Sequence, residues 1–260
     1  MLLDTGADPM NLIWVMPAKG NHLGCNKNTL LWQGVFLSTG GKTVSKRIVI
    51  VANGSPPTIG DINRWCWPGD RLIAADGGAK SALSLGFVPD VVVGDMDSLD
   101  AGTRDQLVQQ GCHLVLHPED KDETDLELAL ILAAREDVSE IVILGALGGR
   151  LDQLLSNILL LTLPELADVS VKLADGEQEA FIVRGGAERS VEGQVGDTLS
   201  LIPLIGDASG VYTQGLRWAL SGDTLLAGAA RGVSNVIASL PVHVRLEKGV
   251  LLVVHRFGGT

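Results

Sequence analysis

Two aspartates with a spacing of two residues, Asp95 and Asp97, follow an apolar run at residues 91–93 and the glycine after it, Gly94. Gly94 lets the chain turn there, so both carboxylates can point into one space. Two carboxylates about 4 Å apart repel by about 4 kcal/mol at an effective dielectric constant near 20, so a nearby cation is needed to keep both ionised. Oxygen ligands suit Mg²⁺, which also takes phosphate oxygens from its substrate. The pair is a candidate magnesium site, and an Asx turn in a surface loop is the alternative.

Asp125 is a third candidate carboxylate. If Asp122 caps a helix that begins near Glu123, Asp125 takes the third helical position, as in a capping box. The same carboxylate can also face the metal. Lys121 is the one positive group within this acidic stretch, and it is either a phosphate partner or a solvated side chain.

A glycine-rich turn at residues 145–149 runs into a predicted helix. Backbone N–H groups in such a turn, and the positive end of the helix dipole, attract phosphate. Arg150 adds a guanidinium that can bind phosphate through two hydrogen bonds. The alternative is an ordinary glycine-rich turn with an exposed arginine.

These polar groups follow five apolar runs, which is the pattern of buried parallel strands. The runs cover residues 48–52, 72–75, 91–93, 113–116 and 141–144. Helical periods lie between or after them, at residues 102–110, 123–137 and 151–163, the last ended by Pro164. Strands that alternate with helices predict an α/β fold with a doubly wound, mostly parallel sheet. Ligands bind outside the carboxyl ends of such strands, where the acidic and glycine-rich turns fall.

Beyond residue 172 the helical periods disappear. Short runs separated by glycines predict strands at residues 198–202, 215–220, 233–239, 242–246 and 250–254. We therefore expect an all-β, sandwich-like C-terminal domain. The predicted organisation is an appendage of unknown role (residues 1–46), an α/β domain (47–172) and a β-sandwich-like domain (173–260).

The composition excludes several classes of protein. The net charge is −11 and aromatic residues are 4%, which argues against a nucleic-acid partner. No uncharged apolar run reaches about 18 residues, so no membrane span is expected. Three cysteines without a C-x-x-C motif indicate neither a disulfide framework nor a zinc site, and favour a cytoplasmic protein.

Taken in series, the motifs resemble those of thiamine pyrophosphokinases. They are AADGGA (74–79), GDMDS (94–98), DKDETD (120–125), GALGGRLDQ (145–153) and GLRWALSGDTLLAGAARGVSN (215–235). The resemblance covers roughly residues 47–260, and the first 46 residues match nothing in the family. Many members carry histidine at the position of Gln153, although glutamine also occurs there.

The resemblance implies a homodimer, with active sites between subunits, that makes thiamine diphosphate and AMP from ATP and thiamine. It implies that residues 47–172 form an ATP-binding catalytic domain and that residues 173–260 form a domain for thiamine binding and dimerisation. Magnesium on the ATP phosphates would be held by Asp95, Asp97 and Asp125. Lys121 and Arg150 would offset charge as AMP leaves. The ATP site would be lined by Asp76, Gly77, Gly78, Thr124 and Asp152, and thiamine would be held by Trp218, Ser234 and Asn235. The residues leave open whether Asp97 or Asp125 accepts the proton of the thiamine hydroxyl.

Two other functions remain open from the sequence alone. A related diphosphokinase could act on a pterin alcohol, which is also a flat heterocycle with a hydroxymethyl arm. A non-catalytic sensor of nucleotide or thiamine diphosphate is the second, although a sensor need not retain three metal ligands. Core packing is the alternative role for Trp218, and a simple turn is the alternative for Ser234 and Asn235.

Overall fold

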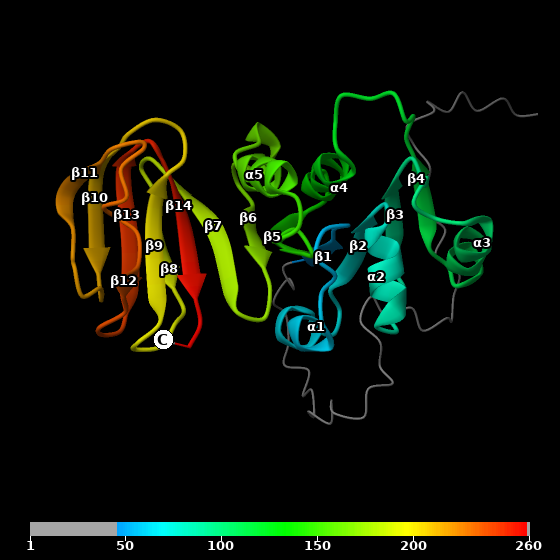
Figure 1. Cartoon of the computed structure of the whole chain (residues 1–260), viewed down its shortest axis with the longest axis horizontal. Coiled ribbons are helices and arrows are strands. Elements are labelled where there is room, and N and C mark those ends of the chain that lie inside the picture. Colours follow the sequence, from blue (N-terminus) through cyan, green and yellow to red (C-terminus); the bar gives the residue numbers. More distant parts are fainter. Residues whose placement is uncertain (1–45, 259–260) are drawn as a thin grey trace, which may run out of the picture.

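The computed structural model describes residues 46–258, so the appendage predicted at residues 1–46 lies outside the described residues except for its last position. Strands and helices alternate in the first part of the chain (Figure 1). In order they are β1 (Lys46–Val51), α1 (Ile59–Trp65), β2 (Arg71–Ala75), α2 (Gly78–Ser84), β3 (Val91–Gly94), α3 (Ala101–Gln109), β4 (His113–Leu116), α4 (Asp125–Ala134), β5 (Val138–Leu144), α5 (Leu151–Leu160), the 3-10 helix η1 (Pro164–Leu166) and β6 (Ser170–Ala174).

The strands of this part form a parallel sheet in the order β6-β5-β1-β2-β3-β4. The direction of winding reverses between β1 and β5, which pair in the sheet although seven helices and strands separate them in the chain. Apolar side chains of α4, α5 and η1 pack on one face of the sheet. Those of α1, α2 and α3 pack on the other. The expected doubly wound α/β fold is confirmed.

The second part consists of strands only. They are β7 (Gln178–Arg184), β8 (Glu188–Val191), β9 (Thr198–Pro203), β10 (Ala208–Gln214), β11 (Ser221–Leu225), β12 (Asn235–Val236), β13 (Val242–Lys248) and β14 (Val250–Arg256). One sheet has the order β11-β10-β13-β8. The other, β12-β9-β14-β7, packs on it through buried residues such as Leu201 and Val253 on one side and Val211 and Val244 on the other. This is the expected sandwich.

The two parts share one sheet. β7 pairs antiparallel with β6, so ten strands run without interruption from β12 to β4. The division expected between residues 172 and 173 therefore falls inside β6 rather than in a linker. Among the described residues, no helix combines the length and apolar character needed to cross a membrane.

Two predicted strands of the second part differ in the structure. Residues 215–220 form a loop with a single β-bridge, Leu216 to Ile237, because Gly215 adopts a φ of +82° that breaks extended structure. The run predicted at 233–239 shortens to the two residues of β12, since Ser234 also has a positive φ, of 60°. Helices α1 and α2 were not predicted.

A series of charged side chains crosses the junction of the two parts. His255 is fully buried, with Nε2 2.9 Å from Asp197 Oδ2 and Nδ1 3.2 Å from Glu179 Oε1. Burial alone would lower the pKa of His255, but the two carboxylates outweigh it and hold that pKa above its usual value. The series continues from Glu179 through Lys172, Glu140 and Arg47 to Asp70, with contacts of 2.7–3.3 Å. Opposite charges thus alternate across the sheet from Asp197, just before β9, to Asp70, just before β2.

Candidate active site

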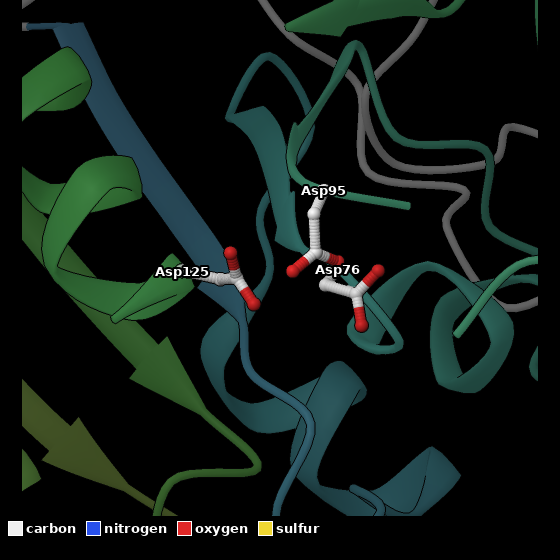
Figure 2. A group of neighbouring side chains, drawn as sticks. All are labelled: Asp76, Asp95 and Asp125. Carbon is white, nitrogen blue, oxygen red and sulfur yellow. The ribbon is translucent and has the colours of Figure 1, made fainter. Parts of the chain in front are cut away.

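Three carboxylates meet at the carboxyl edge of the parallel sheet. Asp76 directly follows β2, Asp95 directly follows β3, and Asp125 is the first residue of α4. One oxygen from each lies within 4.8 Å of the others, and Figure 2 shows the three side chains around a common space. Asp76 is buried and the other two are partly exposed. We call these three residues the carboxylate cluster.

Unusual backbone conformations make this approach feasible. Asp76 and Met96 have φ values of +40° and +64°, which non-glycine residues adopt rarely. Gly94 has a φ of +150°, and a Cβ there would lie 2.9 Å from Asp76 Cβ and 3.0 Å from Asp125 Oδ1. Glycine is therefore required between the two carboxylates. Strained residues of this kind gather at functional sites, where the surrounding fold holds them in place.

The surroundings of Asp76 disfavour its charge. The pKa of Asp76 is raised, mainly by burial. The nearby charges of Asp125 and Asp97 raise it further. Hydrogen bonds from Ser98 and the Gly77 N–H lower it in part. Asp76 Oδ1 is buried and has no hydrogen-bond partner among residues 46–258. A buried carboxylate oxygen without a partner is costly unless a cation or water meets it.

Lys121 supplies a positive charge beside the carboxylate cluster. Its Nζ lies 2.8 Å from Asp125 Oδ1 and 3.5 Å from Asp95 Oδ2. Burial alone would lower the pKa of Lys121, but these two carboxylates outweigh it and raise that pKa. The Asp97 N–H donates to Asp95 Oδ1 at 3.1 Å, and this bond, with the charge of Lys121, lowers the pKa of Asp95.

The start of α4 differs from the sequence prediction. The N-cap is Thr124, whose Oγ1 accepts the Glu127 N–H at 3.2 Å, so Asp122 does not cap the helix. Asp125 consequently occupies the first helical position rather than the third. A carboxylate in the first helical turn is favoured by the helix dipole.

A cavity of about 590 Å³ opens beside the carboxylate cluster. It lies at the point where β1 and β5 diverge, which is where open α/β sheets bind their ligands. Five of the residues predicted from the sequence line it: Asp95, Lys121, Thr124, Asp125 and Arg150. Gln153, which departs from the commoner histidine of the resembled family, also lines it.

Arg150 stands on the rim of this cavity. Its side chain is 74% exposed, and it pairs with the exposed Asp152 at 2.5 Å. The preceding Gly148 and Gly149 have φ values of +77° and +73°, so the turn before α5 requires glycine. Arg150 is the N-cap of α5 and makes no side-chain cap. The Gln153 N–H donates to Asp152 Oδ1 at 3.0 Å, which leaves the N–H groups of Leu151 and Asp152 in the first turn for an anion.

Asn157 is a cavity residue that the sequence reasoning missed. It is buried on α5, and its Nδ2 donates to the Ala146 carbonyl at 2.9 Å. The bond ties α5 to the glycine-rich turn. The signal was a single asparagine within an apolar helical period, which is uncommon without a hydrogen-bond partner.

The remaining predicted residues of this region lie outside the cavity lining. Asp97 is exposed, and its Oδ1 accepts from Ser98 Oγ at 3.2 Å. Thus Asp76, not Asp97, completes the carboxylate cluster. Gly77 and Gly78 permit close packing, because a Cβ on Gly77 would meet the Asn53 side chain and one on Gly78 would meet the Val51 carbonyl.

The residues predicted to hold thiamine gather elsewhere. Asn235 accepts the Trp218 N–H at 3.1 Å and donates to the Trp218 carbonyl at 2.7 Å, and Ser234 precedes it. The Trp218 side chain is 56% exposed, so it does not pack in the core. We call these three residues the Trp218 group. Its strand β12 and the cavity-side strand β3 lie in opposite halves of Figure 1.

The donor set fits a magnesium ion. All ligand atoms of the carboxylate cluster are oxygens, and the buried Asp76 oxygen lacks a partner within the described chain. Hard divalent cations prefer such ligands, and Mg²⁺ is usually held by one or two carboxylates together with substrate phosphates.

Comparisons with known proteins show which family the chain resembles. Residues 66–173 match the family model described as thiamin pyrophosphokinase, catalytic domain, and residues 188–251 match thiamin pyrophosphokinase, vitamin B1 binding domain. The chain is 27% identical over 209 residues to the thiamine pyrophosphokinase of Bacillus subtilis, covering 80% of this chain and 98% of that protein. It is 26% identical to thiamine pyrophosphokinase 1 of Oryza sativa subsp. japonica over 231 residues, or 78% and 84% of the two chains.

Solved structures give the same result. The crystal structure of the Bacillus subtilis thiamine pyrophosphokinase superposes with a TM-score of 0.73 at 27% identity, covering 82% of this chain and all of that one. The yeast thiamin pyrophosphokinase has the same fold, with a TM-score of 0.69 at 15% identity over 83% of this chain and 88% of that one. The two matched models, which span both parts of the fold, show that this chain belongs to the thiamine pyrophosphokinase family of enzymes.

Proposed function

We propose that this chain transfers the diphosphate group of ATP to the hydroxyl of thiamine, giving thiamine diphosphate and AMP. The observation that carries the proposal is the carboxylate cluster beside a 590 Å³ cavity at the β1/β5 divergence. Positive groups, Lys121 and Arg150, line the same cavity. Carboxylates that hold a cation, together with basic side chains, are what a polyphosphate substrate requires.

Each residue has a role in this reaction. Bound by Asp76, Asp95 and Asp125, Mg²⁺ would neutralise charge on the phosphate oxygens. Arg150 and the N–H groups at the start of α5 bind phosphate oxygens at the rim. The thiamine hydroxyl attacks the β-phosphorus, the bond from that phosphorus to the bridging oxygen of the α-phosphate breaks, and AMP leaves with that oxygen. Lys121 stabilises the charge on the leaving group.

The proton of the thiamine hydroxyl passes to a carboxylate. Asp125 lies in the carboxylate cluster, and Asp97 lies beside it on the exposed side. Both remain candidates for the acceptor. Transfer of this kind depends mainly on positioning and charge, so a strong base is not essential.

Thiamine binding belongs to the Trp218 group in this proposal. A flat cationic ring suits the exposed face of Trp218. From β12 to β1 there are six strand-to-strand steps of about 4.8 Å, which is roughly 29 Å along the sheet. This separation supports a homodimer in which the Trp218 group of one subunit faces the cavity of the other.

The alternatives are less well supported. The match to a vitamin B1 binding domain favours thiamine over a pterin alcohol. A non-catalytic sensor would have no need of the carboxylate cluster. The cytoplasmic location stays a prediction from the cysteine pattern.

Product analysis tests the proposal directly. With Mg²⁺, ATP and thiamine, we expect AMP and thiamine diphosphate in equal amounts, and no turnover when a pterin alcohol replaces thiamine. ADP with thiamine monophosphate would contradict it, because those products require attack at the γ-phosphorus.

A further inference from the structure

Lys121 lies where a cation would neutralise the carboxylate cluster. Its ammonium contacts Asp125 and Asp95, two of the three members, and only 11% of its side chain is exposed. None of the described ion pairs includes Asp76, whose Oδ1 lacks a partner. The chain thus brings its own positive charge to part of a site that is suited to a divalent cation.

The two cations compete for the same carboxylates, because the ammonium contacts Asp125 Oδ1 and Asp95 Oδ2. Two positive charges at such short range also repel. A metal that binds all three carboxylates therefore favours departure of the Lys121 ammonium. Because Lys121 also lines the 590 Å³ cavity, the displaced side chain has space to enter.

We propose that Lys121 is a built-in counter-ion of the carboxylate cluster, held by Asp125 and Asp95 until a divalent cation displaces its ammonium into the cavity. The identity of that cation as Mg²⁺ rests on the proposed function. The exchange has two consequences. Without metal, the ammonium of Lys121 offsets the repulsion between the carboxylates and so stabilises the fold around them. With metal, the ammonium is released to the place where phosphate oxygens would lie.

Metal titration without ATP or thiamine tests the exchange. Lys121→Met removes the charge and keeps the approximate length of the side chain. The variant should bind Mg²⁺ at least about tenfold more tightly in calorimetry, since an opposite charge at this range shifts an ionic equilibrium by about one to three powers of ten. The matched control is Lys80→Met, at an exposed lysine of α2 that makes none of the described ion pairs. Its Mg²⁺ affinity should equal that of the wild type. Equal or weaker binding by the Lys121→Met variant would overturn the proposal.

Thermal melting provides a second readout. In EDTA, the Lys121→Met protein should melt below the Lys80→Met control, because its carboxylates have lost their counter-ion. Saturating Mg²⁺ should close this gap. A gap that persists in Mg²⁺ would mean that Lys121 acts through packing alone, which contradicts the proposal.

The wild-type chain offers a test that does not depend on whether the variant folds. Reductive methylation of lysines, followed by mass spectrometry, reports the accessibility of each amine. Adding Mg²⁺ should increase the labelling of Lys121 and leave that of Lys80 unchanged. Unchanged or reduced labelling of Lys121 would show that the ammonium is not displaced.

These experiments contain no thiamine or ATP, so their outcome is separate from the diphosphokinase assay. Failure to form thiamine diphosphate would refute the proposed function and leave the exchange intact. Mg²⁺ binding that is indifferent to Lys121 would refute the exchange and leave the activity intact.

Discussion

Asp76 and Asp97 offer a direct contrast between the sequence motif and the geometry. The motif predicts that Asp97 holds the metal, whereas the structure groups Asp76 with Asp95 and Asp125. Replacing each by asparagine removes one charge and preserves the shape. The two variants should therefore behave differently if the carboxylate cluster is the metal site.

The magnitude follows from the distances in the cluster. Two charges 4.8 Å apart repel by about 3.5 kcal/mol at an effective dielectric constant of 20. Lys121 offsets part of this repulsion, so we take about 1–2 kcal/mol as the relief when Asp76 loses its charge. For a domain of this size, that corresponds to a rise of about 2–8 °C in the melting temperature of the metal-free protein.

Calorimetry with Mg²⁺ and melting in EDTA measure both effects. Asp76→Asn should melt at a higher temperature without metal and lose about a hundredfold in Mg²⁺ affinity, since one of three charged ligands is gone. Asp97→Asn should change the melting temperature and the Mg²⁺ affinity only slightly, because the Asp97 side chain is exposed and accepts a hydrogen bond from Ser98. The reverse pattern, with Mg²⁺ affinity lost only in Asp97→Asn, would refute the assignment of Asp76.

Three further predictions follow from other parts of the structure. Gly94→Ala should lower both the melting temperature and the Mg²⁺ affinity in calorimetry, because a Cβ at φ +150° would push the nearest carboxylates apart; unchanged affinity would contradict this. Trp218→Ala should raise the Michaelis constant for thiamine about tenfold and leave that for ATP nearly unchanged in steady-state kinetics, since a cation–π contact contributes about 2 kcal/mol when desolvated. Mixing the Trp218→Ala protein with the Asp125→Asn protein should restore some activity through hybrid dimers. The pKa of His255 is raised in the folded protein, so its contribution to stability is complete below pH about 6.5 and is lost as the pH rises through the folded-state pKa. Urea unfolding between pH about 6 and 9 should show this decline in the wild type and a flatter dependence of stability on pH in His255→Gln.

The strands of the first part could be predicted because their burial leaves a plain signal. Runs such as residues 48–52 and 141–144 are apolar on both faces, and their ends carry the acidic and glycine-rich turns. Once the runs are taken as parallel strands, the location of the site follows from their carboxyl ends. The helical period at 123–137 likewise predicted α4.

Short-range detail could not be predicted as well. Both Asp122 and Thr124 are good N-cap residues, and only the fold decides that Thr124 receives the Glu127 N–H. Helix α2 begins at Gly78 in a pair of glycines that otherwise indicates a turn, and a Cβ at Gly78 would meet the Val51 carbonyl. The grouping of Asp76 with Asp95 and Asp125 has the same origin: it depends on the positive φ values of Asp76 and Met96, which no periodicity reports.

The proposed function divides the site between the cavity and the Trp218 group, and the shared sheet gives a structural reason for this division. Within one chain, the cavity and the Trp218 group are held apart by the continuous pairing of β5, β6 and β7 and by the buried charges that cross the same strands. If the chain bent at the junction to bring its own Trp218 group across the roughly 29 Å to the cavity, main-chain hydrogen bonds between the strands would break. Buried charges such as Glu179 would also lose their partners, and an unpaired buried charge is costly. A second chain can bring its own Trp218 group to the cavity at no such cost. The rigidity of the junction is therefore an argument for a site completed between subunits, and hybrid dimers are its most direct test.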